Sequence, residues 1–162
     1  MAWELDRRAV LGTVGIGAVA LSVMGPSRGE ASARYAIAHT PAEWRKLLGP
    51  ERYRILREAG TERPFSSPLN KEHRRGFFGC AGCGLPLFSS TAKFDSGTGW
   101  PSFFRPLPNS VVTRADRSVL MERTEVLCRR CGGHLGHVFE DGPKPTGLRY
   151  CMNGLALRFR PA

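Results

Sequence analysis

Between residues 40 and 60 the apolar positions recur with the period of a helix. Thr40 precedes Pro41 and Glu43, which is the pattern of a capping box with proline at the first helical position. A glycine-proline pair should end this first helix, and a second short helix is expected over residues 50–60, ending at its final glycine. The predicted apolar face of the first helix consists of Trp44, Leu47 and Leu48.

Beyond the helices the apolar pattern shortens into extended runs broken by Gly, Pro, Ser and Asn. Leu155, Leu157 and Phe159 alternate with other residue types, which predicts a half-buried strand. Residues 111–113 and 118–127 flank turn residues and are expected to form a hairpin. We therefore expect one small, mainly β domain of the α+β class. The expected loops are residues 103–110 and 141–147.

Length and composition fit one modest globular domain with an additional N-terminal segment. The chain has 162 residues, of which 41% are hydrophobic and 23% charged. Its net charge is +10, and because the charges of residues 1–33 cancel, the whole excess lies in residues 34–162. The basic residues are scattered, so we interpret them as a solvated surface and expect no nucleic-acid partner.

The first 33 residues predict an export signal rather than a folded element. Arg7 and Arg8 directly precede residues 9–24, which carry no charge, and residues 31–33 form an Ala-Ser-Ala site of small residues. This pattern resembles a bacterial twin-arginine signal. We expect a signal peptide over residues 1–33, a mature domain over residues 34–162 and a periplasmic location. Membrane contact is expected only through this segment, which would act as an anchor if it stayed uncleaved.

Four of the five cysteines form two matched Cys-x-x-Cys-Gly units. Each unit lets two thiolates converge on one ion, and the glycine allows the chain to turn beneath the sulfurs. We predict a structural site for one zinc ion, with iron as the second choice. We expect no organic cofactor. The predicted ligands are Cys80, Cys83, Cys128 and Cys131.

Three other interpretations of these cysteines compete with the metal site. Two disulfides would suit an exported protein, although each Cys-x-x-Cys ring is tight. A redox Cys-x-x-Cys is a second possibility. The third is a ligand set of Cys128, Cys131, His134 and His137, which would leave the first unit unused.

The fifth cysteine is the candidate nucleophile. Cys151 lies between Arg149 and Asn153. In an extended segment Arg149 shares a face with Cys151, and its guanidinium should lower the thiol pKa. The competing interpretation is a small buried apolar residue.

Two further blocks carry candidate chemistry. His134 and His137 lie within four residues of chain, and Asp141 follows four residues after His137, which suggests acid–base machinery rather than a second metal site. Residues 95–103 form a glycine- and proline-rich loop that can hold Trp100 partly exposed as an aromatic wall for a sulfur-bearing ligand.

Taken together these blocks resemble the methionine sulfoxide reductase B family. The resemblance runs from about residue 40 to residue 159, with the blocks in the family order. The blocks are residues 61–66 (TERPFS), the two cysteine units, residues 99–103 (GWPSF), residues 134–139 (HLGHVF) and residues 149–153 (RYCMN).

The resemblance implies two small antiparallel sheets flanked by N-terminal helices, with zinc far from the chemistry. It implies reduction of the R epimer of methionine sulfoxide in oxidised proteins or peptides by a monomeric enzyme. Cys151 would attack the sulfoxide sulfur and become a sulfenic acid. The polar site residues would be His134, His137, Asn153, Arg149 and Asp141, with Trp100 and Phe103 binding substrate.

Two positions depart from the family pattern. Many family members carry a second, resolving cysteine where this chain has Thr98, so a thioredoxin-like dithiol is expected to reduce Cys151 directly. Gly154 stands where serine is common, and should alter packing near the nucleophile. Two rival functions remain open at this point, namely a nucleic-acid-binding zinc ribbon and a non-catalytic secreted zinc domain.

Overall fold

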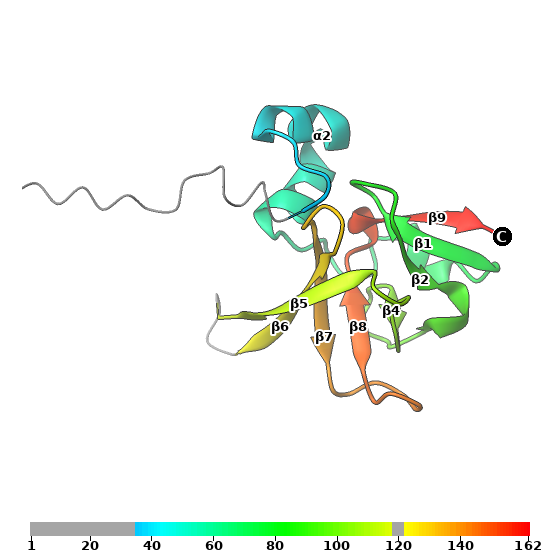
Figure 1. Ribbon diagram of the computed structural model, residues 1–162. Coiled ribbons are helices and arrows are strands. Elements are labelled where there is room, and N and C mark those ends of the chain that lie inside the picture. The colour runs from blue at the N-terminus through cyan, green and yellow to red at the C-terminus, as the bar shows by residue number, and fades with distance from the viewer. Residues whose placement is uncertain (1–34, 118–121) are drawn as a thin grey trace, which may run out of the picture.

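The computed structural model describes residues 35–117 and 122–162 (Figure 1). The predicted export signal and the start of the predicted strand over residues 118–127 lie outside the described residues. Among the helices of the described part, none has the length and apolar character needed to cross a membrane.

Both predicted helices are present as one element, α2 (Pro41–Glu58), which is kinked in the middle. The capping box is confirmed, because the Thr40 amide donates to the Glu43 carboxylate at 2.7 Å and the Glu43 amide donates to Thr40 Oγ1 at 3.3 Å. Gly49 has a φ of 70° and a ψ of 172°, so the helical conformation is broken where the glycine-proline pair predicted.

Two details of α2 differ from the prediction. Trp44 and Leu48 are buried, but Leu47 is 56% exposed, because a residue adjacent to Leu48 is turned away from the narrow stripe that these two occupy. The left-handed residue that ends the helix is Ala59, with a φ of 51°, rather than Gly60.

The described strands form two antiparallel sheets, which confirms the predicted fold class. The smaller sheet has the order β2-β1-β9 and the larger one has the order β3-β4-β8-β7-β6-β5. The strands of the smaller sheet are β1 (Gly76–Cys80), β2 (Pro86–Ser89) and β9 (Leu157–Pro161). Those of the larger are β3 (Lys93–Phe94), β4 (Ser102–Phe103), β5 (Val111–Asp116), β6 (Arg123–Cys128), β7 (His134–Phe139) and β8 (Arg149–Met152).

The predicted hairpin is formed by β5 and β6, which pair from Val111 with Cys128 to Asp116 with Arg123. The predicted C-terminal strand begins later than expected, because Leu155 and Ala156 belong to the 3-10 turn η3 (Gly154–Ala156). Two further short 3-10 turns are η1 (Pro68–Lys71) and η2 (Ser90–Ala92).

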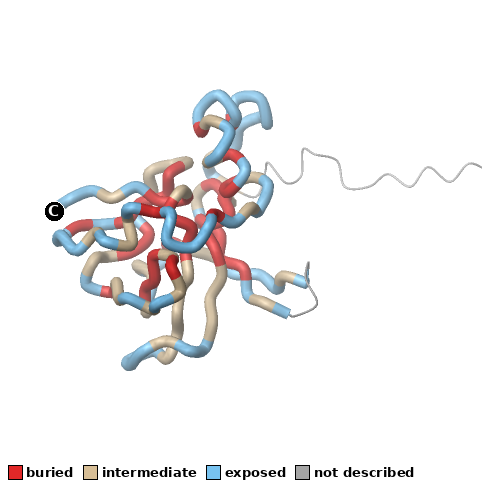
Figure 2. The backbone as a smooth tube through the Cα atoms, turned by 180° about the vertical axis from the view of Figure 1, so that it is seen from behind, coloured by how far each residue is buried: buried red, intermediate tan, exposed pale blue. Residues whose placement is uncertain are grey.

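The core lies where the two sheets and the second half of α2 meet (Figure 2). Phe88 stacks on Phe103 with ring centroids 4.4 Å apart, and Phe78 meets Phe103 edge-on at 5.0 Å. These rings, with Ile55 and Leu56 from α2, are almost completely buried. The core therefore joins both sheets to the helix and fixes the larger sheet as a rigid platform.

Candidate active site and metal centre

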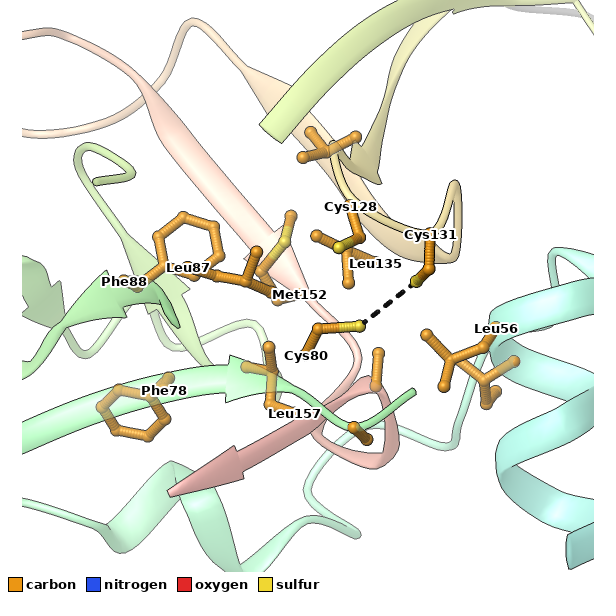
Figure 3. Close-up of a cluster of buried hydrophobic side chains, with 14 of the residues drawn as sticks. Leu56, Phe78, Cys80, Leu87, Phe88, Cys128, Cys131, Leu135, Met152 and Leu157 are labelled. Carbon is orange, nitrogen blue, oxygen red and sulfur yellow. Dashed lines mark hydrogen bonds between the residues drawn. The ribbon is translucent and has the colours of Figure 1, made fainter. Parts of the chain in front are cut away.

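The four cysteines of the two matched units converge on one point. Figure 3 shows Cys80, Cys128 and Cys131 at this point. Their sulfur atoms all lie within 4.8 Å of one another. The Cys80 and Cys131 sulfurs are 3.7 Å apart and those of Cys83 and Cys128 are 3.5 Å apart. Because a disulfide requires about 2.05 Å, the two-disulfide interpretation does not describe this arrangement.

The two units fold in the same way. The Cys80 amide donates to the Leu85 carbonyl at 2.8 Å, and the Cys128 amide donates to the Gly133 carbonyl at 2.9 Å. Gly84 and Gly132 have φ values of 73° and 67°, as predicted for the glycine that follows each pair. Each unit is thus a short turn that directs its two sulfurs toward those of the other unit.

The metal centre is tied to α2. The Arg57 guanidinium donates two hydrogen bonds to the Cys131 carbonyl, at 3.0 and 2.9 Å, and stacks on the Trp44 ring at 4.0 Å. The hydrogen bond with Cys128 leads the contributions that lower the pKa of Cys83 to about 7. Four convergent cysteine sulfurs are a donor set that zinc prefers, so these residues fit one metal ion.

Cys151 lies in a different part of the molecule, on the larger sheet. In β8 it pairs with His137 of β7 on one side and with Ser102 of β4 on the other. Residues directly opposite each other in antiparallel strands project from the same face of the sheet. The register of three strands therefore places the Cys151 sulfur beside the His137 ring.

A β-bulge brings the second histidine to this face. Two residues three apart in a regular strand point to opposite faces. Between Val126 and Leu127 of β6, however, the pairing in β7 advances by two residues, from Gly136 to His134. The rings of His134 and His137 consequently meet edge-on with centroids 5.5 Å apart.

Gly136 makes the bulge possible. Its φ is 153°, and a Cβ there would lie 2.1 Å from the Cys151 carbonyl oxygen. A side chain at this position would therefore separate β7 from β8 beside the candidate nucleophile.

A carboxylate orients His137. Its Nε2 lies 2.8 Å from Asp116 Oδ2, and the same oxygen accepts from the Arg123 guanidinium at 2.8 Å. Burial lowers the pKa of His137, and Arg123 and His134 lower it further, while Asp116 only partly offsets this. The lowered pKa favours the neutral form of the ring.

A second carboxylate holds His134. Its Nδ1 lies 2.6 Å from Glu125 Oε1, and both side chains are buried. Burial opposes ionisation of Glu125, but hydrogen bonds from His134 and Arg114 outweigh burial and lower the Glu125 pKa. His134 Nε2 is buried with no hydrogen-bond partner among the residues that the structure describes. The group of side chains that converges within 4.8 Å consists of the four cysteines, so the alternative ligand set with His134 and His137 does not describe this cluster.

The thiol of Cys151 is surrounded by polar groups yet largely desolvated. Arg149 forms two hydrogen bonds to Asp141, at 2.8 and 2.7 Å, and Thr98 Oγ1 lies 3.9 Å from the Cys151 sulfur. Burial raises the pKa of the Cys151 thiol, and Thr98 and Arg149 do not offset it. Arg149 lowers this pKa, as expected, but desolvation is the larger effect and the net shift is upward.

A cavity of about 130 Å³ opens over the Cys151 sulfur. Trp100 is half-buried at its wall, as predicted, and its Nε1 donates to the Glu62 carbonyl at 3.1 Å. His134 is not among the lining residues and lies behind His137 instead. The cavity is lined by Thr61, Trp100, Arg123, Gly136, His137, Phe139, Cys151 and Asn153.

Glu62 connects several parts of this site and was not predicted. Its carboxylate accepts from the amides of Gly154 at 2.6 Å and Leu155 at 2.9 Å, and its own amide donates to Asn153 Oδ1 at 2.9 Å. Capture of these two amides explains why the chain turns into η3 at Gly154. A Cβ at Gly154 would lie 1.9 Å from the Ser67 hydroxyl oxygen, so glycine at this position allows that close approach.

Phe103 requires a correction. Its side chain is fully buried between Phe78 and Phe88 and does not line the cavity. Phe103 pairs with Tyr150, one residue away from Cys151, and therefore projects to the opposite face of the sheet. It packs the core beneath the site instead of binding substrate.

Sequence reasoning missed the residues that support the predicted ones. Asp116, Arg123 and Glu125 come from the β5–β6 hairpin, and their charges at alternate positions of a strand were the available signal. Nothing in the sequence indicated which histidine each carboxylate would meet.

Residues 48–161 match the model of a family described as the SelR domain. A protein of Leptospira interrogans named peptide methionine sulfoxide reductase MsrB is 54% identical over 127 residues, which cover 78% of this chain and 97% of that relative.

Two further relatives carry the same name. The one from Thiobacillus denitrificans is 59% identical over 123 residues, covering 75% of this chain and 93% of that protein. The one from Pseudomonas putida is 54% identical over 126 residues, covering 77% and 96% respectively.

Proposed function

This chain belongs to the methionine-(R)-sulfoxide reductase B family, and from that premise we propose that Cys151 is its nucleophile. The chain is a peptide-methionine (R)-S-oxide reductase. The observation that carries the assignment of Cys151 is its pairing with His137 beneath a cavity walled by Trp100.

The proposed reaction transfers one oxygen atom. The Cys151 sulfur attacks the sulfoxide sulfur, the sulfoxide S–O bond breaks, and a new S–O bond forms on Cys151. The substrate sulfur is reduced by two electrons to a thioether, and Cys151 is oxidised by two electrons to a sulfenic acid. The thiol proton ends on the transferred oxygen, so atoms and charges balance.

His137 is the proposed carrier of that proton. Because Nε2 is bound to Asp116, Nδ1 is the ring nitrogen left to serve the substrate. A neutral ring can accept the Cys151 proton and donate it to the sulfoxide oxygen, which is a poor leaving group until protonated. A raised thiol pKa and a lowered imidazole pKa favour this starting state.

The other site residues have supporting roles in the proposal. Trp100 receives the methyl group of the substrate, and Asn153, fixed by Glu62, contributes an amide to the polar side of the cavity. Arg149, held by Asp141, stabilises the thiolate as it forms. His134 orients His137 from behind.

We propose that an external dithiol regenerates the enzyme. All the other cysteines lie in the metal cluster, and Thr98 presents a hydroxyl near Cys151 where a resolving thiol would be needed. A thioredoxin-like dithiol would attack the Cys151 sulfenic acid with loss of water to form a mixed disulfide. The second thiol of the same dithiol protein would then attack this mixed disulfide. The attack would release the reduced Cys151 thiol and leave an internal disulfide in the dithiol protein.

The four-cysteine cluster would hold one structural zinc ion with Cys80, Cys83, Cys128 and Cys131 as ligands. The metal would stabilise the fold and take no part in the reaction. We also propose that residues 1–33 direct export by the twin-arginine route, and that the enzyme repairs oxidised proteins in the periplasm.

The decisive experiment offers both epimers of N-acetyl-methionine sulfoxide amide to wild type and Cys151→Ser, with dithiothreitol as reductant. Wild type should reduce the R epimer alone, and Cys151→Ser should lose at least about 1,000-fold in kcat. Its zinc content and circular dichroism should match wild type. Retained activity in Cys151→Ser, or an intramolecular disulfide during turnover, contradicts the mechanism.

A further inference from the structure

A second, wide groove lies outside the proposed catalytic site. It is a groove of about 800 Å³ between α2, η1 and the C-terminal strand β9. Leu69, Leu155 and Phe159 line it and are partly buried against the core. The groove therefore offers apolar surface at a place that the chemistry of Cys151 does not use.

Arginines dominate the charge of the groove. Arg52, Arg63 and Arg158 line it, and each lacks an acidic or hydrogen-bonding side-chain partner among the described residues. Two of the three lining glutamates are already engaged, because Glu62 binds backbone amides and Glu72 binds Arg74. The field at the groove is consequently positive and unbalanced.

The groove and the catalytic cavity share a wall. Thr61 lines the cavity and its neighbour Glu62 lines the groove, while Asn153 lines the cavity and its neighbour Gly154 lines the groove. An extended chain advances about 3.3–3.6 Å per residue. A polypeptide with its sulfoxide side chain in the cavity can therefore reach the groove within a few residues.

We propose that this groove binds the acidic flanking segment of an oxidised polypeptide while its methionine sulfoxide occupies the Cys151 cavity. The inference rests on the proposed function. Arg63 and Arg158 pair with aspartate or glutamate side chains of the substrate, and the leucine and phenylalanine floor receives its apolar residues. Substrate choice would then depend on the sequence around the sulfoxide.

The first arm of the test measures kcat/KM for two peptides of equal length. One carries aspartate and glutamate on both sides of the sulfoxide, and the other carries glutamine and asparagine. Wild type should prefer the acidic peptide about 10-fold at low salt, and this preference should shrink at about 300 mM salt. Arg63→Glu/Arg158→Glu should abolish it and leave kcat/KM for N-acetyl-methionine sulfoxide amide within about twofold.

A matched control separates the groove from net charge. Arg105 and Arg129 are exposed and lie outside the groove. Arg105→Glu/Arg129→Glu makes the same change in net charge and should keep the preference. An equal preference for both peptides in wild type, or equal losses in the two double variants, would overturn the proposal.

The second arm measures binding without turnover. A fluorescent acidic sulfoxide peptide is titrated into Cys151→Ser, with and without Arg63→Glu/Arg158→Glu, and anisotropy reports the Kd. Affinity should fall about 10-fold with the two reversals. If wild type reduces no sulfoxide but this difference in affinity appears, the proposed function fails and the groove stands. Equal displacement of the peptide by a single-stranded oligonucleotide of the same charge would overturn the assignment to an acidic polypeptide.

Discussion

The metal centre and the catalytic face are built by opposite means. Each half of the metal centre is a local turn whose hydrogen bonds close within five residues, and the two halves are nearly copies of each other. The catalytic face instead takes its side chains from four strands of one sheet and from the segment around Glu62. A local motif reveals its chemistry through spacing, whereas a shared face depends on strand register.

The largest effect is expected from the loss of one ligand of the metal centre. Cys80→Ser removes one ligand, and structural zinc contributes on the order of 10–16 kcal/mol against a net stability of about 5–15 kcal/mol. The domain should unfold and lose its metal, as circular dichroism and metal analysis will report. Cys151→Ser is the control and should keep both. A folded, fully active Cys80→Ser would refute the structural role.

The next effect tests the bulge. Gly136→Ala places a methyl group 2.1 Å from the Cys151 carbonyl oxygen and should lower kcat about 100-fold and stability by about 2–4 kcal/mol. Gly147→Ala is the matched control, since Gly147 also has a positive φ but no atom within 4 Å of the added carbon. It should cost about 1 kcal/mol and little activity. Steady-state kinetics measures kcat and urea unfolding measures stability for each variant. Equal losses in the two variants would contradict the need for glycine at position 136.

A smaller effect is expected at Glu62. Glu62→Gln replaces the carboxylate that accepts hydrogen bonds from two backbone amides with a neutral amide. This change should destabilise the fold by about 1.5–3 kcal/mol. Because Asn153 and Trp100 also depend on this segment, kcat should fall about 10-fold with little change in KM. Glu58→Gln, an exposed glutamate of α2 outside the groove and the cavity, should change neither value. An activity loss that follows only the unfolded fraction would remove Glu62 from the site.

The smallest effect is a shift in pH dependence. In the proposed active state the Cys151 thiol is protonated and the His137 imidazole is neutral. The rate should therefore fall in acid, when the imidazole is protonated, and in alkali, when the thiol is deprotonated before substrate binds. The His137 pKa is lowered from about 6.5 and that of Cys151 is raised from about 9, so the plateau should extend beyond both values.

Asp116→Asn removes a group that raises the His137 pKa, and should move the acid limb of the kcat/KM profile to lower pH. Asp95→Asn, on the exposed loop that precedes Trp100, is the control. An acid limb that stays in place or moves upward would separate His137 from the proton transfer.

The sequence predicted those features that depend on neighbours along the chain. The capping box of Thr40, the positive φ of Gly84 and Gly132 and the hairpin of β5 and β6 were all correct because short-range geometry determines them. The four-cysteine cluster was correct because spacing determines the direction of the sulfurs.

Features that depend on distant contacts were missed or wrong. Phe103 follows the catalytic loop in sequence, but the pairing of β4 with β8 turns it into the core. Leu155 keeps the alternation of a strand, but the Glu62 carboxylate, 93 residues away, holds its amide in a turn. Burial, which a sequence does not display, raised the Cys151 pKa against the effect of Arg149.

The bulge at Gly136 has a consequence for how the chain tolerates insertions and deletions. Side chains in a strand alternate with a period of two, so the loss of one residue between His134 and His137 would invert every later position of β7 relative to the sheet. The composition would hardly change, but one imidazole would leave the catalytic face. The number of residues in this strand is therefore as necessary to the catalytic face as the histidines themselves.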